Sequence, residues 1–226
     1  EIPLRLVGSE MCIRDRNISA NVNEMYVGTF HSLCLRIIKE NLEHTRLKRN
    51  YRLLDTFDQK YLVFRNMHRF KNIEGIEEAL SKGGSWKWSE EICNYVNNLS
   101  EELVDADALA ADPDIAVRVL ADMLVTYQTL LTEENLIDFS AIQTECYRLL
   151  TEKPDILEAL REKIRYIMID EYQDTNHAQY QLISLLTHAS GNLCVVGDDD
   201  QSIYRFRGAT IENILGFEEE FPDCTV

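Results

Sequence analysis

The spacing of apolar residues changes along the chain between a pattern typical of helices and a pattern typical of buried strands. Near the start, a short apolar run at residues 25–29 contains a glycine and precedes a helical stripe of apolar positions. The stripe is formed by Leu33, Cys34, Ile37, Ile38 and Leu42. This order predicts a strand, a tight turn and an amphipathic helix.

A second patterned region begins at Tyr166. The run Tyr166–Ile169 is short, continuous and apolar, like a strand that is buried on both faces of a parallel sheet. A helical stripe comes next, and Gly191 offers a stop for that helix. The stripe is formed by Ala178, Leu182, Leu185 and Leu186. A second apolar run, Leu193–Val196, completes the length of one βαβ unit, so we predict two parallel strands and a right-handed helical crossover.

Polar residues come after both predicted strands. Asp170 and Glu171 lie directly after the first strand, and the segment that ends in Gln201 lies after the second. The carboxyl ends of such strands lie on one edge of the sheet, where ligands of open α/β sheets bind. At that edge, one carboxylate can help to coordinate magnesium, and its neighbour can bind a water molecule. The acidic strand of an ATPase uses its carboxylates in this way. Solvated carboxylates, or a charge at a helix N-terminus, are the alternative interpretation.

The middle of the chain is acidic and helical in pattern. Residues 74–114 carry eleven acidic residues against two lysines, a net charge of −9. We therefore expect a helical insertion subdomain at 58–136, between the two parts of an α/β domain at 17–57 and 137–226. Its acidity makes the stretch a poor candidate for contact with duplex DNA at moderate salt.

The composition is that of a globular protein. Of the 226 residues, 45% are hydrophobic and 27% are charged, and the net charge is −16. These values exclude dominant disorder and a generally basic nucleic-acid coat. Nine glycines and four prolines are too few for an all-β protein with many turns. No apolar run approaches the roughly 20 residues of a membrane-spanning helix, so we expect a soluble protein with no membrane partner.

The six cysteines lack the spacing of a zinc site. Most lie in apolar stretches, such as Leu193–Val195, so they are predicted to be reduced core residues, which fits a cytoplasmic protein. Residues 1–16 show neither a helical nor a strand period and resemble translated adapter sequence, so we expect a non-native leader. We also expect the chain to be truncated at both ends.

Four segments resemble motifs of the UvrD/Rep/PcrA-type superfamily 1 DNA helicases. Asp170–Asn176 reads DEYQDTN and resembles motif II of that family, and Val196–Ala209 resembles motif III. Gly28–Ser32 is similar to a DNA-contacting motif, and Ile137–Phe139 to the point where the chain re-enters the motor core. The resemblance implies a RecA-like parallel sheet of the P-loop NTPase type with a helical insertion, and an ATP-dependent helicase of 3′-to-5′ polarity.

The resemblance also assigns roles at the nucleotide, with ATP and magnesium as cofactors. Asp170 would help to hold magnesium, and Glu171 would activate the water that attacks the γ-phosphate. Gln201 would sense that phosphate, because its amide can both donate and accept hydrogen bonds.

Further positions would contact DNA, with single strands and duplex junctions as partners. Tyr204 and Phe206 would stack on bases, and Arg207 would pair with phosphate. Thr29 and His31 would contact the DNA backbone. From the residues alone, Thr29 is equally a helix N-cap, and His31 is equally a half-buried histidine at a helix start.

The chain departs from the family pattern in two places. Phe206 stands where many members have Trp, which predicts weaker stacking. No Gly-x-x-x-x-Gly-Lys-[Ser/Thr] phosphate loop occurs in the sequence, so this chain is not expected to hydrolyse ATP alone. Two other functions remain open: a non-catalytic DNA-binding module, and a magnesium-dependent nuclease that uses Asp170, Glu171 and Asp198.

Overall fold

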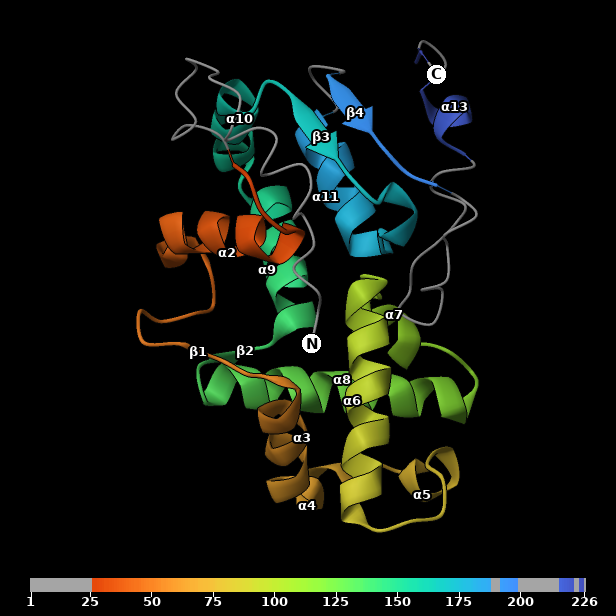
Figure 1. Cartoon of the computed structure of the whole chain (residues 1–226). Coiled ribbons are helices and arrows are strands. Elements are labelled where there is room, and N and C mark those ends of the chain that lie inside the picture. Colours follow the sequence, from red (N-terminus) through yellow and green to blue (C-terminus); the bar gives the residue numbers. More distant parts are fainter. Residues whose placement is uncertain (1–25, 188–191, 199–215, 222–223, 226) are drawn as a thin grey trace.

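The computed structural model describes residues 26–187, 192–198, 216–221 and 224–225, and these residues are mainly helical (Figure 1). The helices are α2 (Phe30–Glu40), α3 (Thr56–Arg65), α4 (Met67–Phe70), α5 (Ile76–Ala79), α6 (Ser85–Glu101), α7 (Ala106–Ala110), α8 (Ile115–Glu133), α9 (Phe139–Glu152), α10 (Pro154–Lys163), α11 (His177–Thr187) and α13 (Phe217–Glu220). Two 3-10 turns are η2 (Leu42–His44) and η3 (Tyr172–Asp174). The strands are β1 (Arg52–Leu53), β2 (Leu136–Ile137), β3 (Ile167–Ile169) and β4 (Leu193–Val195).

The strands form two separate parallel pairs among the described residues. β1 pairs with β2, and β3 pairs with β4 with Ile167 opposite Leu193. Helix α11 connects β3 to β4, so the predicted βαβ unit is confirmed. The architecture is therefore α/β with short parallel strands and many helices, and the larger RecA-like sheet remains a prediction.

The strand predicted at residues 25–29 is wrong for the described part of that segment. Residues 26–29 form no strand, and helix α2 begins immediately after them at Phe30. An apolar run becomes a strand only where a neighbouring strand satisfies its backbone, and no described strand pairs with this segment.

The expectation that the β3 and β4 runs are buried on both faces is also wrong. Side chains alternate between the faces of a strand. Ile169 is buried and packs with Ile183 of α11, whereas Tyr166 and Met168 are 80% and 75% exposed. Cys194 shares this alternation and is exposed, so it is not the core thiol that its apolar neighbours suggested. Three other cysteines, Cys34, Cys93 and Cys146, are buried free thiols as predicted.

Two large hydrophobic cores organise most of the helices. The first core runs from Leu54 to Leu136 and contains the buried faces of α3, α4, α5, α6 and α8, which occupy the lower half of Figure 1. The second core lies under α2, α9, α10 and α11, close to β3 and β4 in the upper half. The acidic stretch at 74–114 lies within the residues that form the first core.

Helix α8 forms the centre of the first core. Of the helices in the described part of the chain, α8 is the one whose length and composition would allow it to cross a membrane. Its buried residues are Val119, Ala121, Met123, Leu124, Tyr127, Leu130 and Leu131. Such a run of core contacts explains the apolar composition of α8.

Asp138 joins the two cores. Its carboxylate caps α9 by accepting from the backbone N–H of Ala141 at 2.7 Å. It also accepts hydrogen bonds from the hydroxyl of Tyr127 on α8 and from Gln59 Nε2 on α3, the latter at 3.2 Å. Burial raises the pKa of Asp138, and the hydrogen bonds and Arg46 oppose that rise. A buried carboxylate with this many partners fixes where the helices meet.

Candidate functional site

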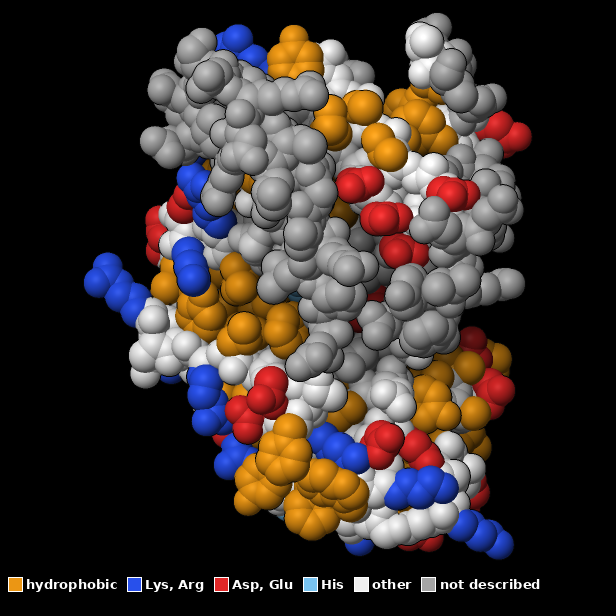
Figure 2. All heavy atoms as spheres, viewed as in Figure 1, with side chains coloured by type: hydrophobic (Ala, Val, Ile, Leu, Met, Phe, Trp, Pro, Cys, Tyr) orange, Lys and Arg blue, Asp and Glu red, His pale blue; other side chains and the backbone are white. Residues whose placement is uncertain are grey.

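The carboxylate pair lies where β3 ends. Asp170 and Glu171 are both exposed, and Asp170 Oδ1 accepts a hydrogen bond from the backbone N–H of Glu171 at 3.1 Å. Glu171 has φ 54° and ψ 45°, a left-handed conformation that is costly for a residue with a Cβ atom. The sharp turn it makes leads directly into η3. Figure 2 shows acidic side chains gathered on this face, beside the β3–β4 pair.

Gln173 joins the ends of the two strands. Its Nε2 donates to Glu171 Oε2 at 2.7 Å, and its Oε1 accepts from the backbone N–H of Asp198 at 3.0 Å. Gln173 is only 1% exposed, whereas Glu171 is exposed, so both bonds are partly buried. The prediction that polar residues after both strands share one edge is confirmed as far as Asp198.

Tyr172 packs in the interior next to this edge of the β3–β4 pair. It is fully buried, its ring meets the ring of Phe217 edge-on at 5.7 Å, and its backbone N–H donates to the carbonyl of Val196 at 2.9 Å. Ile169 and Ile183 complete the small core under η3. The aromatic residue between the acidic pair and Gln173 therefore anchors the turn.

Thr29 and His31 lie at the start of α2. Thr29 is the N-cap, and its hydroxyl oxygen accepts from the backbone N–H of Ser32 at 3.3 Å. His31 is half-buried, lies edge-on to Phe139 with ring centroids 5.6 Å apart, and contacts Gln143 Nε2 through its own Nε2 at 3.1 Å. Burial lowers the pKa of His31, and a hydrogen bond to the backbone of Phe139 opposes that change. The cap and the half-buried histidine are thus both confirmed, and DNA contact by either residue stays a prediction.

Several predicted positions lie outside the described residues. They are Gln201, Tyr204, Phe206 and Arg207. Their assignments stay predictions from the resemblance.

Sequence reasoning missed three polar residues near the site: Gln143, Gln173 and Asn176. Gln173 and Asn176 belong to the DEYQDTN segment, but the motif resemblance assigns them no role. Gln143 lies on α9 beside the buried positions Ile142 and Cys146, and it is itself 1% exposed. The sequence did offer one signal for Gln143, which is its position next to the apolar stripe of a helix. A glutamine at such a position is buried, and a buried amide needs hydrogen-bond partners.

The nuclease interpretation is not supported by the described residues. It requires a cluster of Asp170, Glu171 and Asp198 that could hold metal ions, yet no group of three or more such ligands occurs in the described part of the chain. The bond from Gln173 to Asp198 uses the backbone N–H and does not enlist the Asp198 carboxylate.

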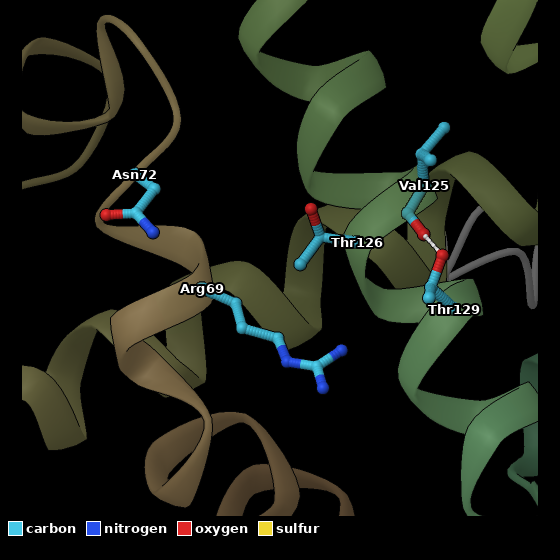
Figure 3. Close-up of a pocket in the computed structure, with 5 residues that line it drawn as sticks. All are labelled: Arg69, Asn72, Val125, Thr126 and Thr129. Atoms are coloured by element: carbon cyan, nitrogen blue, oxygen red, sulfur yellow. Dashed lines mark hydrogen bonds between the residues drawn. The ribbon is translucent and has the colours of Figure 1, made fainter.

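A shallow pocket lies in the other half of the molecule. It has a volume of about 270 Å³ between α4 and α8 (Figure 3). Its lining residues are Arg69, Asn72, Val125, Thr126 and Thr129. Arg69 is paired with Glu133 at 2.8 Å, and the hydroxyl of Thr129 donates to its own helix at the carbonyl of Val125. Since these polar groups are engaged with the protein, this pocket is a weaker candidate than the β3–β4 edge.

An aromatic patch lies on the surface of α3 and the start of α6, over which Figure 2 shows hydrophobic side chains. It consists of Phe57, Tyr61, Phe64 and Trp86, which are between 40% and 64% exposed. Lys60 is stacked on it, 4.6 Å from the centre of the Trp86 ring, and also pairs with Glu90.

Comparison with known proteins decides the family. The family model described as UvrD/REP helicase N-terminal domain matches residues 6–222. This chain belongs to that family. It is 36% identical over 203 residues to the ATP-dependent DNA helicase PcrA of Staphylococcus aureus (strain Mu50), and equally to PcrA of Staphylococcus epidermidis (strain RP62A). Each match covers 88% of this chain and 26% of the relative, so the chain spans about a quarter of their length.

Membership of the UvrD/REP family confirms the resemblance drawn from the four motifs. The matched span contains the acidic pair, the start of α2 and the residues after β4. It also begins inside residues 1–16, and the expectation that this segment is a foreign leader stays a prediction.

Proposed function

We propose that this chain is part of the first motor domain of an ATP-dependent DNA helicase. In this proposal the helicase moves 3′ to 5′ on single-stranded DNA and separates duplexes during repair or replication in the cytoplasm. The observation that carries the proposal is the shared edge of β3 and β4, where Asp170 and Glu171 are exposed and Gln173 bonds to both sides. Family membership supports the same activity, and supports a RecA-like sheet that continues beyond these two strands.

The donor groups at this edge fit magnesium. Mg²⁺ prefers oxygen ligands, keeps several waters, and is commonly held by one or two carboxylates together with substrate phosphates. Asp170 offers an exposed carboxylate for this purpose at the end of β3. When bound, magnesium ATP supplies the phosphoryl group that is transferred to water.

Glu171 is the proposed base for that water. Its carboxylate is held by Gln173 at 2.7 Å and points out from a turn whose backbone is fixed by Tyr172. A base that is held in one orientation needs no reorganisation when the water is deprotonated. Gln201 is the proposed sensor of the terminal phosphate. Thr29, His31, Tyr204, Phe206 and Arg207 are the proposed DNA-contacting residues.

The base is tested in the complete helicase polypeptide by Glu171→Gln, which keeps the size and removes the charge. We expect nucleotide binding to remain and DNA-stimulated ATP turnover to fall by at least about a hundredfold. Glu158→Gln, an exposed glutamate on α10 that pairs with Arg161, is the matched control and should leave turnover unchanged. Turnover of Glu171→Gln within a few-fold of the unaltered protein would remove Glu171 from this role.

DNA stacking is tested by Tyr204→Ala combined with Phe206→Ala, with fluorescence anisotropy of a labelled oligothymidylate. Each lost stack is expected to weaken binding by about 1–3 kcal/mol. Tyr61→Ala with Phe64→Ala removes an exposed pair of rings from the aromatic patch and serves as the control. Equal affinities for both double variants would end the stacking hypothesis. DNA binding by the complete polypeptide without ATP turnover would favour the non-catalytic binding module.

A further inference from the structure

Gln143 bridges two segments that sequence reasoning treated separately. It lies on α9, is 1% exposed, and contacts His31 of α2 through Nε2 at 3.1 Å. On its other side, Gln143 Oε1 accepts a hydrogen bond from Asn176 Nδ2 at 3.2 Å. Asn176 ends the segment that begins with Asp170 and Glu171. A single buried amide thus connects the start of α2 to the turn that presents the acidic pair.

One backbone donor, the N–H of Gln179, sets the direction of the hydrogen bonds that lead through Asn176 and Gln143 to His31. The N–H of Gln179 can only donate, and it donates to Asn176 Oδ1 at 3.0 Å, so the Asn176 amide nitrogen must face Gln143. Gln143 therefore presents its oxygen to Asn176 and its nitrogen to His31. Because that amide nitrogen is also only a donor, His31 Nε2 must be an acceptor.

The remaining ring nitrogen of His31 completes the chain of contacts. A neutral imidazole carries one N–H, so with Nε2 as the acceptor from Gln143 the proton is on Nδ1. The ring is thus held as the neutral Nδ1–H tautomer, with Gln143 at Nε2 and the ring of Phe139 packed edge-on against it.

The Gln143 amide has two alternative orientations with opposite consequences. If His31 Nε2 becomes protonated and donates toward Gln143, its favourable partner is the oxygen of Gln143, and the amide must rotate. Its NH₂ group would then face the NH₂ group of Asn176, two donors with no acceptor between them. Asn176 could correct this only by rotating as well, which removes the acceptor that caps α11. Asn176 is also a hydrogen-bond partner of Glu101 on α6, but that bond does not supply an acceptor for the backbone N–H of Gln179.

We propose that Gln143 is a positioning residue that couples a contact at His31 to the turn carrying Asp170 and Glu171. This inference rests on the proposed function, because it takes a phosphate of single-stranded DNA as the group that contacts His31. The two orientations of the amide supply the discrete states that such coupling requires. The path is short: Asn176 lies two residues after η3, and Gln173 within η3 holds the Glu171 carboxylate.

Two substitutions at Gln143 and one control substitution, made in this 226-residue polypeptide, test the coupling. Gln143→Leu removes both hydrogen bonds at similar size. Gln143→Glu keeps an acceptor for Asn176 and offers a carboxylate to His31, so His31 should become a doubly protonated imidazolium. Thr144→Val, on the adjacent position of α9, removes hydrogen bonds to Ser100 and Ser140 and touches neither His31 nor Asn176.

The first readout is the pair of ring ¹⁵N shifts of His31 at neutral pH. We expect an unprotonated Nε2 in the unaltered chain and in Thr144→Val, and two protonated nitrogens in Gln143→Glu. A merely structural glutamine would lower stability on substitution but would not set the protonation of His31. A protonated Nε2 in the unaltered chain would overturn the bond directions on which the proposal depends.

The second readout is titration with oligothymidylate while following the Asn176 side-chain amide signals. DNA should shift the His31 and Asn176 signals in the unaltered chain and in Thr144→Val, whereas in Gln143→Glu the Asn176 shift should vanish, because a carboxylate has two equivalent oxygens and no second orientation. In Gln143→Leu we expect the His31 shift to remain, the Asn176 shift to vanish, and affinity to fall roughly three- to tenfold. Equal Asn176 shifts in Gln143→Leu would refute the coupling and leave the DNA site intact. If the unaltered chain bound no DNA, the proposed DNA face would fail with the coupling, while the ¹⁵N result would still decide the bond directions.

Discussion

The left-handed backbone at Glu171 offers a direct test of whether this turn is kept for function at the expense of stability. Glu171 has φ 54°, and a residue with a Cβ atom adopts this conformation at a cost of about 1–2 kcal/mol. The comparison is Glu171→Gly against Glu171→Ala. Both remove the carboxylate and its bond to Gln173, so they differ only in the Cβ atom and in the freedom of the unfolded chain.

The expected difference comes from two opposing effects at Glu171. Glycine relieves the strain of about 1–2 kcal/mol. It also leaves the unfolded chain more flexible, which costs the folded state about 0.4–1 kcal/mol. The strain is the larger effect, so Glu171→Gly should be more stable than Glu171→Ala by about 0.5–1 kcal/mol.

Urea unfolding followed by circular dichroism measures this difference, provided that both variants show the same dependence of free energy on urea. Glu90 provides the control, since it is an exposed glutamate within α6. There, Gly should be less stable than Ala by about 1 kcal/mol. If Glu171→Gly were equal to or less stable than Glu171→Ala, the turn would not be strained. The left-handed geometry would then carry no functional argument.

Three further outcomes are expected from urea unfolding. Asp138→Ala should destabilise the chain by about 2–4 kcal/mol, because it removes a helix cap and leaves the buried Tyr127 hydroxyl without its acceptor; a loss below about 1 kcal/mol would contradict its role as the joint between the cores. Thr29→Ala should cost about 1 kcal/mol and Thr29→Ser much less, since serine keeps the capping oxygen; equal losses would exclude the cap. Burial lowers the pKa of His31 from 6.5, so the unfolded chain binds the proton more tightly. The contribution of His31 to the free energy of unfolding should be complete above pH 6.5 and should be lost as the pH falls through the lower pKa of the folded state. His31→Gln should therefore flatten the dependence of the free energy of unfolding on pH. An unchanged pH dependence would show that His31 does not cause it.

Sequence pattern alone determined the elements whose signal is local. The helical stripe from Leu33 to Ile38 became α2, with Leu42 just beyond it in η2, and two apolar runs with a helix between them became the parallel β3–α11–β4 unit. Residue order also placed Asp170 and Glu171 after a strand, because chain direction alone sets which residues emerge at the carboxyl edge of a parallel pair. The DEYQDTN segment, together with the segments at 28–32, 137–139 and 196–209, indicated the family.

Tertiary structure decided everything that depends on a partner distant in sequence. Whether Met168 is buried depends on what covers each face of the sheet, and alternation along a strand cannot reveal that. The left-handed backbone at Glu171 occurs at a residue with a Cβ atom, directly before the buried Tyr172, so no glycine marks it in the sequence. The bond between Gln143 and Asn176 joins residues 33 positions apart, and that between Gln143 and His31 joins residues 112 apart. Hydrogen bonds of this kind have no periodicity, so only the folded chain brings their donors and acceptors together.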